Sequence, residues 1–172
     1  MALLEKKGYG QVEPNHLSGQ ATKQLYAGLP VAKEVIEATS QKAIEKGMFL
    51  VYDMASDAMT TDYTAGEPML VFSEVKLYHP WESYKDFALT EAKSSDKKVY
   101  PRLVKTNVGD HFTTNLVDIT TAFGAALKGK TLVPVKGILT EKAPAAGDQV
   151  WKIVKVYTLA DNQKAVKIQR VK

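Results

Sequence analysis

The residues from Gly124 to Thr131 match the phosphate-binding pattern G-x-x-x-x-G-K-S/T at every fixed position. In that pattern, backbone amides and the lysine hold nucleotide phosphates, while the final hydroxyl contacts magnesium. A phosphate-binding loop is followed by a helix, because the positive end of the helix faces the anion. Here Thr131 is followed by a strand-like run that contains Pro134 and Gly137. The context therefore favours a tight turn at Gly129 between strands, and nucleotide binding stays an alternative.

Acids and histidines, the other candidates for chemistry, do not show the spacing of a metal site. Four acids lie in one loop-like stretch with serine and threonine: Asp53, Asp57, Asp62 and Glu67. They do not alternate as calcium ligands do, and the glycine at the sixth position of a calcium-binding loop is absent. The three histidines lack H-x-H or H-x-x-x-H spacing: His16, His79 and His111. We predict no metal site, although the sequence leaves open whether the Asp53–Glu67 loop binds calcium.

The chain has no cysteine, so it contains no disulfide, no thiolate nucleophile and no cysteine-ligated metal. The G-x-S-x-G sequence of serine hydrolases is absent, and so is the combined motif set of the serine β-lactamases. We therefore expect no catalytic residue, no cofactor and no enzymatic activity.

The size and composition are those of one ordinary domain. The chain has 172 residues, of which 45% are hydrophobic and 24% charged, and this composition excludes a disordered or fibrous protein. Uncharged stretches are far shorter than the ~20 residues that cross a membrane as a helix. Glu5 lies where a secretory signal has its apolar run. We expect a protein that has no membrane segment and is made in a reducing cytoplasm.

The net charge of +4 comes from the C-terminal end, since the rest of the chain is balanced. From Asp148 to Lys172 there are six basic residues and two acids, and a basic segment suggests an anionic partner. Lys152 and Lys155, however, are an odd number of residues apart, and such residues in a strand point to opposite faces. We therefore do not favour a nucleic-acid partner, and a β-barrel that binds nucleic acid stays an alternative.

Residues 1–30 differ in composition from the rest of the chain. Glycine and proline interrupt this segment too often for a regular helix or a long strand. Apolar and aromatic side chains are nevertheless more frequent than in a flexible linker. We predict an extended N-terminal arm that lies on a neighbouring subunit, with five partner-binding anchors: Tyr9, Val12, Leu17, Leu25 and Tyr26. The alternative is that the same residues cover an edge of their own domain.

The segment from Val31 to Lys46 is the best helix candidate. Apolar and small residues recur at the spacing of one helix face: Ala32, Val35, Ile36, Thr39 and Ala43. Pro30 precedes the first turn and Gly47 follows the last one, as is typical of helix ends. We predict one short peripheral helix, within a helix and linker segment of residues 31–47.

After Gly47 the chain is rich in valine and threonine, which favour strands. Glycine- and proline-containing turns separate the expected strands: Met48–Asp53, Met69–Tyr78, Val99–Lys105, Phe112–Asp118, Thr131–Leu139, Gln149–Leu159 and Lys164–Val171. The last two form a hairpin across Asp161 and Asn162. Short strands with almost no helix between them indicate a mainly β domain over residues 48–172, an antiparallel β-barrel or a sandwich.

Several blocks of this sequence resemble a family of tailed-bacteriophage virion structural proteins: Leu4–Ser18, Gly47–Asp53, Met69–Tyr78, Pro101–Asp110 and Trp151–Asp161. The resemblance implies a non-enzymatic particle component, a capsid decoration or cement protein that reinforces the shell. Its partners would be the major capsid protein or other virion subunits, and it would form a homo-oligomer on the particle. Its location would be the virion capsid, after synthesis in the host cytoplasm. A related alternative is that the chain forms the shell itself.

Overall fold

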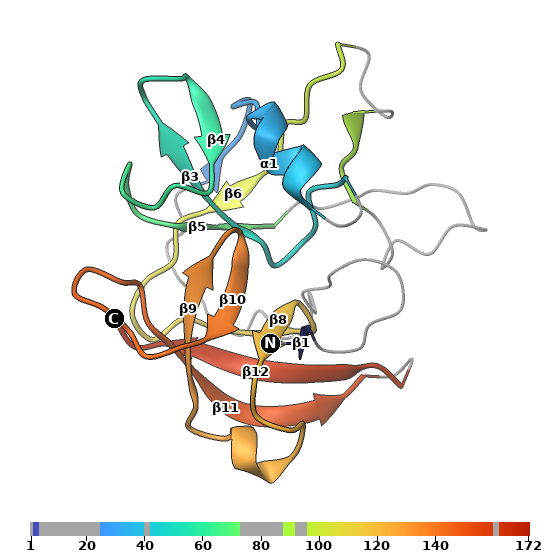
Figure 1. Ribbon diagram of the computed structural model, residues 1–172, viewed down its shortest axis with the longest axis vertical. Helices are drawn as coiled ribbons and strands as arrows, with labels where there is room; N and C mark the ends of the chain where they lie inside the picture. The colour runs from blue at the N-terminus through green and yellow to red at the C-terminus, as the bar shows by residue number, and fades with distance from the viewer. Residues whose placement is uncertain (1, 4–24, 40–41, 73–87, 92–95, 160–161) are drawn as a thin grey trace.

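The computed structural model of the protein (Figure 1) describes residues 2–3, 25–39, 42–72, 88–91, 96–159 and 162–172. This part of the chain consists of two β-sheets, one α-helix and one short 3-10 helix. The mainly β fold with one short helix is therefore confirmed. None of the described helices is long and apolar enough to cross a membrane.

A seven-stranded sheet forms the lower half of the molecule in Figure 1. Its strands, in spatial order, are β1 (Ala2–Leu3), β8 (Val117–Ile119), β10 (Ile138–Glu141), β9 (Thr131–Val135), β11 (Trp151–Thr158), β12 (Lys164–Arg170) and β7 (His111–Thr114). All neighbours are antiparallel except β8 and β10. The edge strands of this sheet are β1 and β7, and no ladder joins them in the described structure. The sheet is therefore not closed into a barrel, and of the two predicted architectures the sandwich fits.

A five-stranded antiparallel sheet lies above it, and the α-helix packs against this second sheet (Figure 1). Its strands, in spatial order, are β2 (Leu25–Tyr26), β6 (Leu103–Val104), β5 (Met69–Val71), β3 (Phe49–Asp53) and β4 (Ala58–Thr60). Helix α1 covers Lys33–Ala38 and buries Val35 and Ile36. These two side chains belong to an apolar cluster that also contains Leu50 and Met59 from the sheet.

Helix α1 is much shorter than the predicted segment from Val31 to Lys46. At Thr39 the backbone becomes extended, with φ −77° and ψ 142°. The Thr39 hydroxyl donates a hydrogen bond to the Ile36 carbonyl at 2.8 Å and accepts one from the Ala43 amide at 2.9 Å. A threonine side chain that bonds to the backbone in this way competes with continued helix. The helix therefore ends after Ala38.

The predicted strand from Thr131 to Leu139 is wrong in its extent, because the chain reverses inside it. Lys136 and Gly137 have φ angles of +48° and +91°. Positive φ at both central residues is the geometry of the tight turn that best connects two antiparallel strands. The segment is consequently the hairpin of β9 and β10. Asn115 and Leu116 likewise divide the strand predicted from Phe112 to Asp118 into β7 and β8.

The two apolar cores meet at Phe49, the first residue of β3. Its ring lies in the core of the seven-stranded sheet, where it packs edge-to-face on Trp151 with centroids 5.5 Å apart. Its amide donates a hydrogen bond to the Gly137 carbonyl at 2.8 Å. The neighbouring Leu50 points into the other core, together with Met48. One short stretch of β3 therefore contributes to both cores.

The Tyr63 hydroxyl completes this junction between the sheets. It donates a hydrogen bond to the Phe49 carbonyl at 3.0 Å and accepts one from the Gly137 amide at 2.8 Å. Burial raises the pKa of Tyr63 well above its ordinary value, so the hydroxyl keeps its proton and remains a donor. A single side chain thus bonds to the backbone of β3 and to the turn of the β9–β10 hairpin.

Replacing Tyr63 by phenylalanine is expected to destabilise the protein by about 1–3 kcal/mol, because the Gly137 amide loses its hydrogen-bond acceptor. Urea unfolding followed by circular dichroism measures this cost. Tyr100→Phe is the matched control, since its hydroxyl bonds to Asp96 at 2.7 Å on the surface. We expect the control to change stability by less than about 0.5 kcal/mol. Equal effects of the two variants would contradict the role assigned to Tyr63.

Candidate binding pocket

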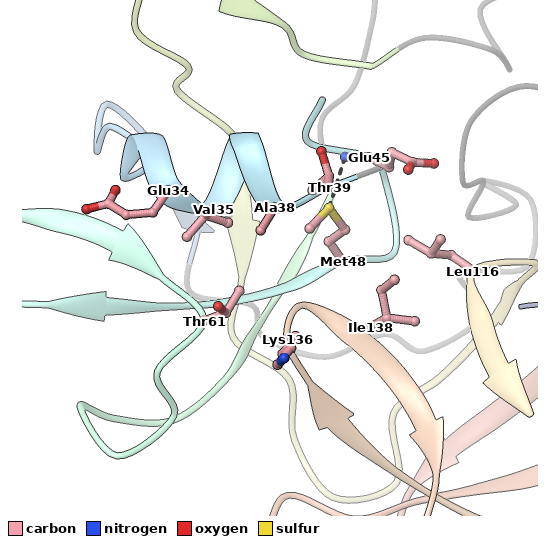
Figure 2. A pocket seen from close by; sticks show the side chains of 10 residues that line it. All are labelled: Glu34, Val35, Ala38, Thr39, Glu45, Met48, Thr61, Leu116, Lys136 and Ile138. Carbon is pink, nitrogen blue, oxygen red and sulfur yellow. Dashed lines mark hydrogen bonds between the residues drawn. The ribbon is translucent and has the colours of Figure 1, made fainter. Parts of the chain in front are cut away.

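A pocket of 490 Å³ lies between helix α1 and the tip of the β9–β10 hairpin (Figure 2). Its lining comes from helix α1, from the β9–β10 hairpin and from segments next to β3, β4 and β8: Glu34, Val35, Ala38, Thr39, Glu45, Met48, Thr61, Leu116, Lys136 and Ile138. A volume of this size is within the range of sites that bind small molecules. The pocket therefore lies at the seam between the two sheets.

The floor of this pocket is apolar. Met48 and Leu116 are almost completely buried, at 2% and 1% exposure, and Val35 is buried beside them. Figure 2 shows Val35 and Ala38 on the helix, with Ile138 of the hairpin across from them. Aliphatic and thioether groups of this kind bind an apolar partner by dispersion and by exclusion of water.

Most polar groups of the lining are either already bonded or exposed at the rim. The Thr39 hydroxyl serves the end of the helix, as described above. The Glu45 amide donates to the Met48 sulfur at 3.3 Å, and the Glu45 side chain is buried and has interaction partners. Glu34 and Lys136 are exposed on opposite sides of the pocket. The arrangement suits a ligand with an apolar body and polar groups at its edge.

The segment from Gly124 to Thr131 has the turn structure that its sequence context predicts. Ala125–Leu127 form a single 3-10 turn, Gly129 has a φ angle of +84°, and Thr131 begins strand β9. Lys130 faces Glu141, with 3.9 Å between the Nζ and Oε1 atoms. The helix that would point its positive end at a phosphate is replaced by a strand.

Two acids of the Asp53–Glu67 loop, Asp53 and Asp62, act as local caps, whereas Glu67 pairs with the distant Lys105 and Arg170. Asp53 accepts hydrogen bonds from the Ala55 amide at 2.9 Å and the Ser56 hydroxyl at 2.7 Å. Asp62 accepts bonds in the same way from the amide and the hydroxyl of Thr64. In the described parts of the chain, no three acids or histidines lie together in a way that could hold a metal ion.

Three of the predicted anchors lie outside the described residues, namely Tyr9, Val12 and Leu17. Two of the three histidines also lie outside them, namely His16 and His79. His111 begins strand β7.

The two ends of the predicted arm pair with the chain's own sheets. Ala2 and Leu3 form β1 against β8 at the edge of the larger sheet. Leu25 and Tyr26 form β2 against Leu103 and Val104 of β6. The backbone at both ends of residues 4–24 is therefore fixed by the body, and the anchor role of the five predicted residues stays a prediction.

The pocket residues were not among the site residues predicted from the sequence. They come from five separate segments of the chain, represented by Val35, Met48, Thr61, Leu116 and Ile138. Only Val35 and Thr39, four positions apart in the apolar stripe predicted for the helix, carried a local signal.

Comparisons with protein-family models, with curated proteins and with solved structures each found no match to this chain.

Glu141 organises the loop beside Lys130 through a charge-dependent set of hydrogen bonds. It accepts bonds from the amides of Thr120 and Thr121, both at 2.8 Å, and from the Thr121 hydroxyl at 2.6 Å. Burial alone would raise the pKa of Glu141, but these hydrogen bonds outweigh it and lower the pKa to about 2. The folded protein therefore favours the ionised form of this side chain.

Replacing Glu141 by alanine is expected to cost about 1–3 kcal/mol of stability at neutral pH, because the two amides lose their acceptor. Since the pKa is lower in the folded protein, this contribution is present above the ordinary value of 4.5 and is lost as the pH falls towards 2. Urea unfolding of the wild type and the variant between these pH values tests the expectation. Glu37→Ala, which removes only a surface pair with Lys33, is the control. A difference that persists unchanged at low pH would contradict this role of the Glu141 charge.

Proposed function

We propose that this chain is a non-enzymatic structural protein of a tailed-bacteriophage virion, a capsid decoration or cement protein that binds and reinforces the shell. The sequence blocks that resemble such proteins support this proposal, and so does the sandwich-like fold. In this proposal the partner is the major capsid protein or another virion subunit, and many copies act on one particle. A weak contact suffices there, since repeated and linked contacts multiply through effective concentration.

The observation that carries the proposal is the apolar floor of the pocket between α1 and the β9–β10 hairpin. The groups that form the floor adhere to a partner but do not transfer protons or attack bonds. An aliphatic or aromatic side chain of a shell subunit fits the volume, and buried anchors of this kind supply most of the energy of protein interfaces. Glu34 and Lys136 at the rim can pair with opposite charges around that anchor.

In this proposal the N-terminal arm makes a second contact with the capsid shell. Its ends are fixed at β1 and β2, so binding through the residues between them costs less ordering entropy than binding through a free tail. Tyr9, Val12 and Leu17 are the proposed anchors in this part. Leu25 and Tyr26 also remain proposed anchors, and their backbone already pairs with β6.

The pocket is tested by filling it from the helix. Ala38→Trp places a large ring at an exposed lining position of the pocket. We expect at least a tenfold loss of affinity for capsid shells assembled without this protein, measured by co-sedimentation. Glu37→Trp adds the same ring to the same helix at an exposed residue outside the lining, and it should bind normally. Equal binding by both variants would remove the pocket from the proposed interface.

The arm is tested by shortening two of its proposed anchors. Tyr9→Ala combined with Leu17→Ala should reduce occupancy on the same shells, because apolar contact with the partner is lost. The control is Met54→Ala, which truncates the side chain of a residue that is 82% exposed in the β3–β4 turn. If the arm variant occupies the shell as fully as wild type, its residues do not act as anchors.

A further inference from the structure

A β-bulge in strand β11 brings lysines of the C-terminal hairpin onto one face. Ile153 pairs with Ile168, but the next pair is Lys155 with Lys167, so Val154 has no partner in the register. The extra residue resets the alternation of side chains. Lys152 and Lys155 consequently share a face although they are an odd number of residues apart. The prediction that they point to opposite faces is wrong for this reason.

This lysine face, defined as Lys152, Lys155 and Lys167, lies on the side of the sheet opposite the core. Ile153, Val156, Val166 and Ile168 of the same two strands point into the core around Trp151. Lys152 and Lys155 are exposed, and Lys167 is half-exposed. The three cations are therefore available on the surface of the seven-stranded sheet.

The charges of the lysine face are not compensated within the described structure. Lys155 and Lys167 lie directly opposite each other, a placement that destabilises a sheet when the charges are alike. Their register neighbours are uncharged or histidine: Thr131, Gln169, His111, Thr113, Tyr157 and Ala165. Ion pairs within the described residues are formed by other cations, among them Lys33, Lys105, Lys130 and Arg170. An external anion would relieve this repulsion.

One contact orients the lysine face. The Lys155 ammonium lies over the Tyr157 ring, 4.8 Å from its centroid. This cation–π contact fixes the lysine stem and lowers the entropy that it loses on binding. It also covers one side of the ring, so the face presents charge rather than a platform for stacking bases. The arrangement favours contact with a charged backbone.

The anionic partner of such a face is either an acidic protein surface or a nucleic acid, and the use of lysine distinguishes between them. Lysine is depleted at the centres of protein–protein interfaces, whereas lysine and arginine supply the phosphate contacts of nucleic-acid-binding proteins. The sequence pI of 9.1 and the clustering of lysines on one face are also typical of such proteins. We propose that the lysine face binds the phosphate backbone of nucleic acid, independently of base sequence. This inference goes beyond the structural role proposed above and does not depend on it.

The salt dependence of binding to a labelled DNA duplex of about 20 base pairs tests the proposal on the isolated protein. Three phosphate contacts give a slope of about −2.7 for the logarithm of the affinity against the logarithm of the salt concentration. The affinity should therefore fall about 40-fold between ~50 and ~200 mM salt. A change of base sequence at constant length should leave the affinity unaltered.

Substitutions that remove one positive charge each show which lysines contribute to the salt dependence of binding. Lys155→Gln and Lys167→Gln should each reduce the slope by about 0.9. Lys167→Gln should also raise the midpoint of urea unfolding, because it removes the repulsion between the two lysines and keeps the contact of Lys155 with Tyr157. Lys128→Gln, at an exposed lysine after the 3-10 turn, is the control and should leave the slope unchanged. A misfolded variant would instead lower the unfolding midpoint, so loss of binding through misfolding is recognised.

Two outcomes would overturn the proposal. The first is a slope that is the same in the wild type and in both variants of the lysine face. The second is equal competition by poly-L-glutamate at matched charge concentration, which would assign the face to an acidic protein surface. Because neither measurement uses capsid shells, the result is independent of the particle-binding experiments.

Discussion

The contact between the hairpin turn at Lys136–Gly137 and the first residue of β3 joins the two halves of this fold. Phe49 inserts its ring against Trp151 in one core while its amide bonds to the Gly137 carbonyl. Tyr63 bonds to both backbones at the same point. The hydrogen bonds work because the site is shielded from water, where an unpaired amide would be costly. The relative placement of the sheets, and with it the candidate pocket, depends on this contact.

The pocket is a direct consequence of that junction. Met48 precedes Phe49, and Ile138 follows Gly137, so the chain segments that hold the sheets together also supply two lining side chains. Helix α1 ends early, at the Thr39 hydroxyl, and its last residue Ala38 is too small to fill the remaining space. The proposed binding through this pocket is therefore built on the junction that holds the two sheets together.

The strand content was predictable from the sequence, because valine- and threonine-rich runs alternate with turn residues. The locations of reversals were harder to predict. A turn with a lysine at positive φ, as at Lys136, lacks the usual asparagine or aspartate signal. Only a weak indication of the bulge at Val154 is present in the sequence, namely two successive apolar residues shortly after Trp151. The bulge reverses the expected direction of the Lys155 side chain. The pocket had almost no local sign, since its residues become neighbours only through the junction of the sheets.

The pairing of β11 has a consequence for how copies of the chain behave when they are crowded. Strand β9 pairs with β11 at Trp151 and Lys152, and the turn before β9 extends this contact through Ile153, whose backbone bonds to Gly129 and Lys130. Beyond Ile153 the described structure places no strand beside this side of β11. An uncovered strand margin can template fibre growth between identical molecules. The kink at Val154 and the charge of Lys155 interrupt a straight, apolar margin, and they thereby limit uncontrolled polymerisation at high local concentration.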